Sequence, residues 1–326
     1  MHEKSPPRQR IDAIDIARGV ALLAMAVYHF AWDLEFFGYV EPGLTAVGGW
    51  KLFARSIASS FLFLAGVSLF LAHANGIRWS GYLRRLAMVA GAALAISVAT
   101  RLATPDGFIF FGILHEIALA SILCLAFVRL PAIVTLLAAG LIIAGPHFLR
   151  SPFFNDPWWW WTGLSQALPR SNDYVPVFPW MGAVLAGVAA AKIARRTGLL
   201  SWLAGLDFGR WSGPLAFAGR HSLATYLIHQ PVLIACVWAV VQFIPPAQQA
   251  PEARFLRSCE AACLETRDTE FCPRYCTCMI EGLKRGNTFE NVLAGDQSLK
   301  LQSRVEETAQ VCTDETDGAI LEGKFE

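Results

Sequence analysis

Two ionisable residues, His29 and Asp33, stand four positions apart in the apolar stretch "AVYHFAWDL". On a helix, side chains at positions i and i+4 are neighbours, so Asp33 is expected to accept a hydrogen bond from one ring nitrogen of His29. Such a contact fixes the tautomer of the imidazole and raises the basicity of its other nitrogen. The pair is therefore a candidate general base or acyl-accepting histidine, and a purely structural hydrogen bond between helices is the alternative.

Other apolar stretches also contain histidines. His115 lies in "FGILHEIAL", and "GRHSLATYLIHQP" holds His221 near its start and His229 about two turns further on. Because polar groups at bilayer depth are costly, they usually face a cavity or a partner. Each histidine taken alone is more often structural than catalytic. Several of them in one small bundle indicate a polar path for a reaction or for transport.

Two further groups of charged and polar residues lie at the ends of apolar stretches. In "RIDAIDIARG", Asp15 and Arg18 are three positions apart and predict an ion pair or an anion-binding element. In "SNDYVPVFPW", Asp173 and Tyr174 directly precede an apolar run. Asp173 is expected to cap the start of the helix formed by that run, and this is the simpler explanation of the residue.

The composition indicates what positions these residues. The chain has 326 residues, 55% hydrophobic and 16% charged, and a mean hydropathy of +0.42. These values are typical of a membrane protein. A spanning helix needs about 20 mainly apolar residues, and seven segments qualify: 17–38, 52–74, 83–102, 108–129, 131–149, 176–194 and 220–244. The predicted fold class is all-α, a polytopic membrane helix bundle of about seven spans. A re-entrant hairpin formed by the fourth and fifth segments is the alternative.

Basic residues in short loops predict the orientation, since such loops stay in the cytoplasm. With seven spans, most basic loop residues fall on one side of the membrane, and Arg150 and Arg170 are the exceptions. The residues on that one side are Lys4, Arg8, Arg10, Arg78, Arg84, Arg85, Arg129, Lys192, Arg195 and Arg196. The N-terminus is thus expected in the cytoplasm, and the C-terminal tail on the other side. The aromatic stretch "SPFFNDPWWWWTG" resembles an interfacial tryptophan belt. We expect no cleavable signal peptide, because the first apolar run is too long and contains charges.

The segment that begins at "IPPAQQAPEAR", with a proline-rich linker at 245–251, reads as a separate, cysteine-rich region. We therefore divide the chain into a transmembrane domain, 1–244, and an extracytoplasmic tail, 245–326. Six cysteines crowd the tail: Cys259, Cys263, Cys272, Cys276, Cys278 and Cys312. The twin spacing "CEAAC" and "CPRYC" suits a disulfide-bonded helical hairpin, and an oxidising compartment agrees with the predicted orientation. We favour the pairs 259–276, 263–272 and 278–312, although other pairings are open. A zinc site is the less favoured alternative because the tail has no histidine.

Four stretches together carry a resemblance: "AIDIARGVALLAMAVYHFAWDL", "FIFFGILHEIALASIL", "DYVPVFPWMGAVLAGV" and "FAGRHSLATYLIHQPVL". In order and spacing they resemble bacterial members of the heparan-alpha-glucosaminide N-acetyltransferase catalytic-domain family, over about residues 10–240. The resemblance implies a membrane acyltransferase that passes an acetyl group from cytosolic acetyl-CoA to a sugar on the far side. The implied location is the bacterial inner membrane, and the tail would be periplasmic.

The resemblance also implies site residues. The catalytic candidates are His29, Asp33, His115 and His229, and the substrate-binding candidates are Asp15, Arg18, Asp173, Tyr174, Arg220 and His221. The chain departs from the lysosomal members at one point. They have an asparagine at the position of His29 and a histidine in the following loop, whereas here the loop "EFFGYVEPGLTAVGG" has none. Assigning the catalytic role to His29 is therefore our own inference.

The leading hypothesis is an acetyl-CoA-dependent membrane acyltransferase that needs no metal and acts on an extracytoplasmic glycan. The chemistry expected of it is removal of a proton from the acceptor by His29, while His229 stabilises the oxyanion or carries the acyl group. Membrane lipid, the acyl-CoA donor and the glycan are the expected partners, and nucleic acid is not. A small transporter or proton-coupled permease that uses the same histidines is the alternative. A membrane anchor that displays the tail is the third hypothesis.

Overall fold

The computed structural model describes residues 11–167, 169–246, 251–296 and 298–322, and every regular element in these ranges is a helix. The predicted all-α polytopic class with a cysteine-rich helical extension is confirmed. Lys4, Arg8 and Arg10, which support the predicted orientation, lie outside the described residues, as do positions 247–250 of the predicted linker. The chain divides into two units, one formed by the chain up to His29 and by Lys51–Val232, the other by Phe30–Trp50 and the chain from Leu233.

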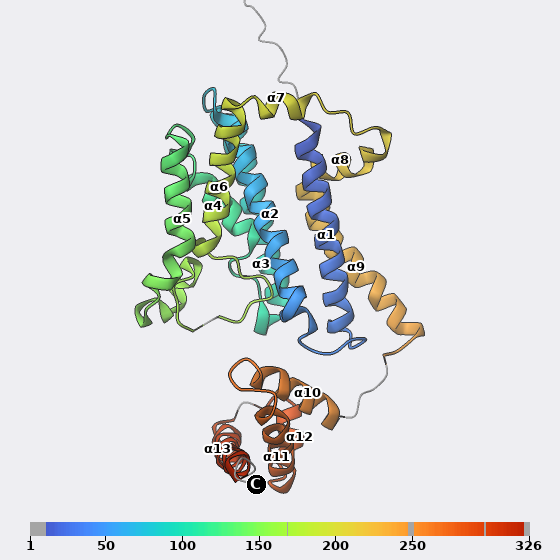
Figure 1. Ribbon diagram of the computed structural model, residues 1–326. Helices are drawn as coiled ribbons and strands as arrows, with labels where there is room; N and C mark the ends of the chain where they lie inside the picture. The colour runs from blue at the N-terminus through green and yellow to red at the C-terminus, as the bar shows by residue number, and fades with distance from the viewer. Residues whose placement is uncertain (1–10, 168, 247–250, 297, 323–326) are drawn as a thin grey trace, which may run out of the picture. The chain divides into compact units, whose positions relative to one another are not determined.

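Six helices in the described part of the chain are long and apolar enough to cross a membrane. They lie side by side in Figure 1 and are α1 (Asp12–Phe36), α2 (Gly48–His73), α3 (Trp79–Ala103), α5 (Ala132–Leu149), α6 (Val177–Arg196) and α9 (Ser222–Phe243). Each coincides with one predicted span. A helix satisfies its own backbone hydrogen bonds in lipid, which is why long apolar runs fold in this way.

The predicted fourth span, residues 108–129, differs from the other six. Its regular part is α4 (Ile113–Leu123), eleven residues long, followed by the 3-10 turn η3 (Ala126–Val128). Eleven helical residues rise about 16 Å, roughly half of a hydrocarbon core. Residues before α4 take hydrogen bonds from α3 instead: Ile109 N–H donates to Thr100 Oγ1, and Ser97 Oγ donates to the Ile109 carbonyl. The expectation of a full-length fourth helix was wrong, because side chains of α3 satisfy the backbone there.

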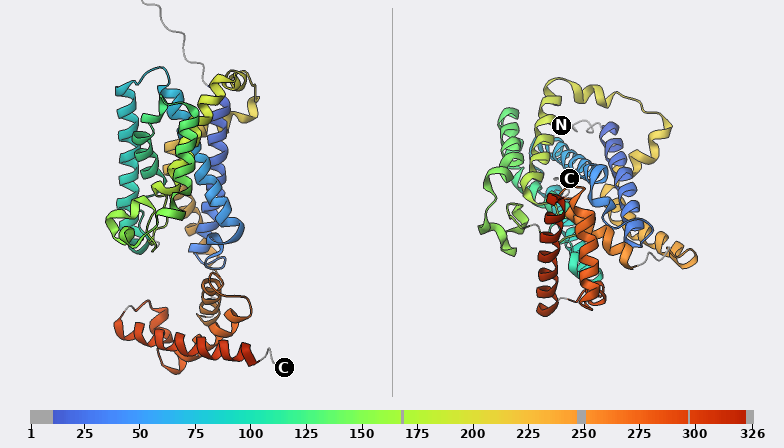
Figure 2. Two further views of the ribbon diagram at one scale, coloured as in Figure 1. Left: turned by 60° about the vertical axis from the view of Figure 1, so that its left-hand side comes forward. Right: turned by 60° about the horizontal axis from the view of Figure 1, so that its bottom comes forward.

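Short elements connect the long helices. They are η1 (Leu44–Ala46), η2 (Pro105–Gly107), η4 (Pro152–Asn155), η5 (Pro157–Thr162), α7 (Leu199–Ala204), η6 (Arg210–Ser212) and α8 (Gly213–Arg220). The aromatic stretch forms η4 and η5, and Trp158 in it is 86% exposed. Helix α7 crosses one end of the bundle between α6 and α8 (Figure 1), and the views in Figure 2 show the same arrangement.

Glycines allow α2 and α6 to approach closely. A Cβ atom built on Gly66 would lie 1.9 Å from the carbonyl oxygen of Val184, and one on Gly187 would lie 2.0 Å from that of Phe63. Small residues at helix crossings bring backbones together in membrane proteins. The two helices therefore depend on reciprocal glycines at their contact.

Replacing Gly66 with alanine is expected to lower the thermal stability of the protein in detergent. The added methyl group meets backbone rather than a flexible side chain, so α2 and α6 must separate, at a cost of about 1–3 kcal/mol. Gly140→Ala in α5 is the matched control, because nothing lies within 4 Å of its built Cβ. A Tm that falls equally in both variants, or in neither, contradicts this role of Gly66.

Lys192 in α6 belongs to the interior of the bundle, not to the basic loop in which the sequence placed it. Its Nζ donates to the carbonyls of Phe127 and Leu130 and, at 2.8 Å, to Thr135 Oγ1. The Phe127 carbonyl lies within η3, and the Leu130 carbonyl lies in the segment between η3 and α5. Lys192 thus closes the turn between α4 and α5 and is a poor indicator of orientation.

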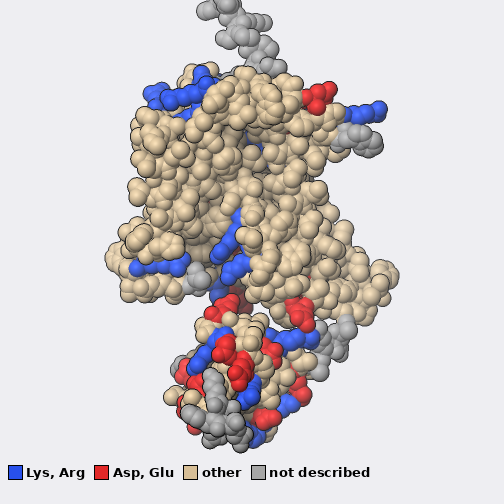
Figure 3. Space-filling model, viewed as in Figure 1, with Lys and Arg blue, Asp and Glu red and all other residues tan. Residues whose placement is uncertain are grey.

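The C-terminal extension has four helices of its own: α10 (Pro251–Cys263), α11 (Phe271–Arg285), α12 (Phe289–Leu293) and α13 (Leu299–Glu322). Disulfides join Cys259 to Cys276, Cys263 to Cys272 and Cys278 to Cys312, which is the favoured pairing. The first two disulfides close the α10–α11 hairpin, and the third joins α11 to α13. Figure 3 shows charges of both signs crowding this extension, whereas most of the visible bundle surface has none.

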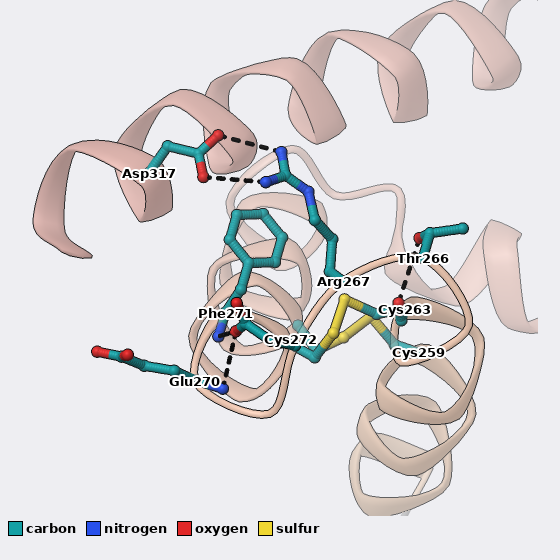
Figure 4. The surroundings of a disulfide bond; sticks show 10 residues. Cys259, Cys263, Thr266, Arg267, Glu270, Phe271, Cys272 and Asp317 are labelled. Atoms are coloured by element: carbon teal, nitrogen blue, oxygen red, sulfur yellow. Dashed lines mark hydrogen bonds and ion pairs between the residues drawn. A yellow bond between two sulfur atoms is a disulfide. The ribbon is translucent and has the colours of Figure 1, made fainter. Parts of the chain in front are cut away.

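The loop between α10 and α11 is also fixed to α13. The Arg267 guanidinium donates to both carboxylate oxygens of Asp317, at 3.2 and 3.4 Å, and lies over the Phe271 ring (Figure 4). A small apolar core that includes Met279, Ile280 and Leu283 lies between the helices. Disulfides are the usual supplement where a small region cannot bury a large core.

Candidate functional site

His29 and His229, 200 positions apart in the chain, are in direct contact. His29 lies in the second half of α1 and His229 in the first half of α9, and 2.6 Å separates His29 Nδ1 from His229 Nε2. Their ring planes are 11° from parallel, and the ring centroids are 4.9 Å apart. The sequence predicted both histidines as site residues but not their contact.

Tyr226 determines which nitrogen of each ring carries a proton. The backbone carbonyl of Tyr226 lies 2.5 Å from His229 Nδ1 and can only accept, so His229 Nδ1 is the donor. A neutral His229 then has its lone pair on Nε2, which accepts from His29 Nδ1–H. The lone pair of His29 is left on Nε2, and none of the described residues forms a hydrogen bond with that atom. The arrangement therefore leaves one ring nitrogen of the pair with an unshared lone pair.

Asp33 lies one helical turn after His29 on α1 and is fully buried. The sequence suggested Asp33 as the residue that orients His29. In the structure the hydrogen-bond partner at His29 Nδ1 is the ring of His229 instead. His29 is therefore hydrogen-bonded to a histidine from another helix, and the orienting role expected of Asp33 stays a prediction.

His115 has both ring nitrogens in hydrogen bonds. The hydroxyl of Ser97 donates to the Ile109 carbonyl at 2.6 Å, so His115 Nε2–H is the donor to Ser97 Oγ, 3.0 Å away. His115 Nδ1 accepts the Gly112 N–H at 3.2 Å. The ring holds the first turn of α4 against α3 and has no lone pair left for a substrate. This geometry favours a structural role over the catalytic role that the sequence suggested.

Asp173 caps a helix, but not the one we expected. Its Oδ2 accepts the Ile113 N–H at 2.9 Å, at the start of α4 rather than of α6. Burial raises the pKa of Asp173, and this hydrogen bond partly opposes the shift. Next to it, the Tyr174 hydroxyl donates to the Trp160 carbonyl at 2.6 Å, and burial raises the pKa of Tyr174 to about 12. Through its hydrogen bond to Ile113, Asp173 joins the loop before α6 to the start of α4.

Three of the substrate-binding candidates meet at the start of α1. Asp15 Oδ1 lies 2.9 Å from Arg18 Nη1, and Asp15 Oδ2 lies 3.7 Å from Arg220 Nε. Arg220 also pairs with Asp12 at 3.0 Å, and Arg18 donates to Ser68 of α2. The backbones touch here as well, because a Cβ built on Gly219 would lie 1.8 Å from the Asp15 carbonyl oxygen. This cluster anchors α8 on α1.

His221 does not join that cluster. It is exposed, and its Nδ1 lies 3.0 Å from the Phe217 carbonyl one turn earlier in α8. Sequence reasoning did not select Asp12, Ser68, Ser97 or Tyr226 for the site. Only Tyr226 had a usable signal, because its position three residues before His229 puts both side chains on one helical face.

No group of three or more histidine, cysteine or acidic side chains among the described residues is arranged to hold a metal ion. The six cysteines of the extension are all engaged in disulfides.

The fold and the site define a polytopic helical membrane protein with a histidine pair inside its bundle. Residues 10–231 match the family described as "Heparan-alpha-glucosaminide N-acetyltransferase, catalytic", so the chain belongs to this family, and the resemblance seen in the sequence is confirmed. The family is named for N-acetyl transfer. No curated protein and no solved structure matches the chain. The C-terminal extension lies outside the matched region.

Proposed function

We propose that the protein is a membrane acetyltransferase that moves an acetyl group from cytosolic acetyl-CoA to an extracytoplasmic sugar or glycan. The family supports the reaction class. The observation that carries the proposal is the His29–His229 pair, because it leaves a basic nitrogen inside the bundle. Membrane lipid surrounds the site, and the acyl-CoA and the glycan are its proposed substrates.

The proposed reaction uses His29 Nε2 as general base. It removes a proton from the acceptor N–H or O–H as the acceptor atom attacks the thioester carbonyl. The C–S bond then breaks, acetyl remains on the acceptor, and the CoA thiolate takes up the proton from His29. His229, held by the Tyr226 carbonyl, accepts the His29 Nδ1–H bond throughout and stabilises the imidazolium that forms. The second proton transfer returns the pair to its starting state.

We place the donor at the end of the bundle where basic side chains gather. Arg195 at the end of α6 donates a hydrogen bond of 3.0 Å to Asn75 in the turn between α2 and α3. The basic end of α6 therefore contacts the α2–α3 turn, which also has basic residues. Arg78 and Arg84 lie in or beside that turn. The phosphates of acetyl-CoA are anionic and suit this surface. By the charge rule this end is cytoplasmic, which puts the N-terminus in the cytoplasm and the tail in the periplasm of a bacterial inner membrane.

Reconstituted protein tests the function. Liposomes that contain the purified full chain are given labelled acetyl-CoA outside and glucosamine inside, and labelled N-acetyl sugar is measured in the lumen. We expect transfer that depends on the protein. A failure to bind acetyl-CoA and to form acetylated sugar overturns the proposal, and proton-dependent solute uptake by the same liposomes would instead support the permease.

A further inference from the structure

A groove lies between α2, α3 and α4, near the turn that joins α2 to α3. The rings of His73 and Tyr82 meet edge to face there, with centroids 5.4 Å apart. Tyr82 Oη donates to the Ser121 carbonyl at 3.2 Å. These two contacts join the three helices around the groove. The residues that line it are Ala65, Leu69, His73, Tyr82, Arg85, Leu86, Val89 and Ser121.

The groove changes from polar to apolar along its length. His73 is the last residue of α2, and Ala65, eight residues earlier in the same helix, lies about 12 Å deeper in the bundle. Helix α3 returns in the opposite direction, so Val89 lies about 10 Å deeper than Tyr82. One end of the groove is therefore polar and close to the membrane surface, and the other end is apolar and reaches toward the membrane interior.

Aromatic side chains indicate where the membrane surface meets this groove. Trp79, the first residue of α3, is 58% exposed, and its ring centroid lies 5.9 Å from that of Tyr82. Trp and Tyr are enriched at the level where lipid headgroups meet the hydrocarbon. Arg85 lies six residues after Trp79, and an arginine side chain is long enough to reach back to the headgroups from that depth. The polar end of the groove therefore lies at the level of lipid phosphates.

The guanidinium of Arg85 has no counter-charge within the protein. No described residue forms a hydrogen bond or an ion pair with it, and none of the residues that line the groove is acidic. Lys192, another cation inside the bundle, is held by two carbonyls and the hydroxyl of Thr135. Because a charge at bilayer depth is costly, it usually has a partner. An anion from outside the chain would provide one for Arg85.

We propose that this groove binds an anionic phospholipid, with the headgroup phosphate at Arg85 and one acyl chain along the apolar end. A guanidinium can bind a phosphate through two parallel N–H bonds. Leu69, Leu86 and Val89 provide the apolar wall for the chain. Basic pockets between spanning helices bind anionic headgroups in the same way. A zwitterionic headgroup suits the site less, because its ammonium group is repelled by Arg85. The inference does not depend on the proposed function.

Native mass spectrometry of the full chain in detergent tests the groove, with dioleoyl phosphatidylglycerol as the probe. We expect the wild type to bind this lipid at least tenfold more tightly than dioleoyl phosphatidylcholine, which has the same acyl chains. Arg85→Gln should weaken binding of phosphatidylglycerol about tenfold, the loss expected for one charge-assisted contact. Arg84→Gln is the matched control, because it removes the same charge from the next position of α3 and does not line the groove. Its affinity for phosphatidylglycerol should change by less than about twofold.

Three results would overturn the proposal. Equal affinity of the wild type for the two lipids would show that the headgroup charge is not recognised. Equal losses in Arg84→Gln and Arg85→Gln would show general attraction to a basic surface. Displacement of bound phosphatidylglycerol by acetyl-CoA would assign the groove to the phosphates of the donor, whereas we expect the lipid to remain bound. The Tm of each lipid-free variant checks its folding. If Arg85→Gln does not fold, the lipid comparison and the acetyl-CoA competition with the wild type decide the proposal.

Discussion

His29→Ala is expected to lower kcat for acetyl transfer by about 100-fold or more, with little change in the KM for acetyl-CoA. The variant removes the nitrogen with the free lone pair, and a positioned general base contributes about 10²–10⁴ to the rate. Initial rates with labelled acetyl-CoA in proteoliposomes measure the loss. The remaining helix contacts of α1, including the Gly19 approach to Leu215, are untouched by the substitution.

His147→Ala is the control for this variant. His147 lies in the last turn of α5 and is exposed, so the same substitution there should leave the rate unchanged. Wild-type activity in His29→Ala would remove His29 from the reaction. Loss of activity in both variants, together with lower Tm values, would show damage to the fold rather than to the chemistry.

Replacing Cys278 and Cys312 together with serine is expected to release α13 from the rest of the extension. Loss of a native disulfide typically costs about 2–5 kcal/mol, and this one is the covalent link between α11 and α13. The small core around Leu283 loses one side as a result. Limited proteolysis of the full-length protein should then cut at residues of α13 at least ten times faster than in the wild type.

Cys236→Ser is the matched control, because Cys236 is an exposed free cysteine in α9. Its proteolysis pattern should equal that of the wild type. An unchanged cleavage rate in the Cys278→Ser, Cys312→Ser double variant would mean that the Arg267–Asp317 ion pair and the apolar core hold α13 without the disulfide.

Most of the fold could be predicted because long apolar runs have few alternatives in lipid. The prediction of a full-length helix in the fourth segment was wrong for a physical reason that hydropathy does not measure. Ser97 and Thr100 of α3 bind the backbone of Ile109, and this allows an extended stretch where the sequence predicted a helix. Such partners are contributed by another part of the chain and cannot be found from the periodicity of the segment itself.

The same limit applies to the site. The sequence identified His29 and His229 from their unfavourable surroundings, but paired His29 with Asp33 because only local spacing was visible. It assigned Asp173 as the cap of the helix that follows it, whereas the N–H that Asp173 accepts belongs to Ile113 at the start of α4. The first two disulfides were predictable because the twin spacing acts within one hairpin, where sequence distance and spatial distance agree. Cys278 and Cys312 were then the remaining pair.

A double-mutant cycle on His29 and His229 tests the central claim most directly. Rates of labelled acetyl transfer are compared for the wild type, His29→Ala, His229→Ala and the double variant under identical conditions. If the histidines act as one unit, the double variant should be no slower than His29→Ala by more than about twofold, because either loss disables the pair. Losses that multiply would show two independent roles, and transfer at the wild-type rate without both histidines would contradict the account.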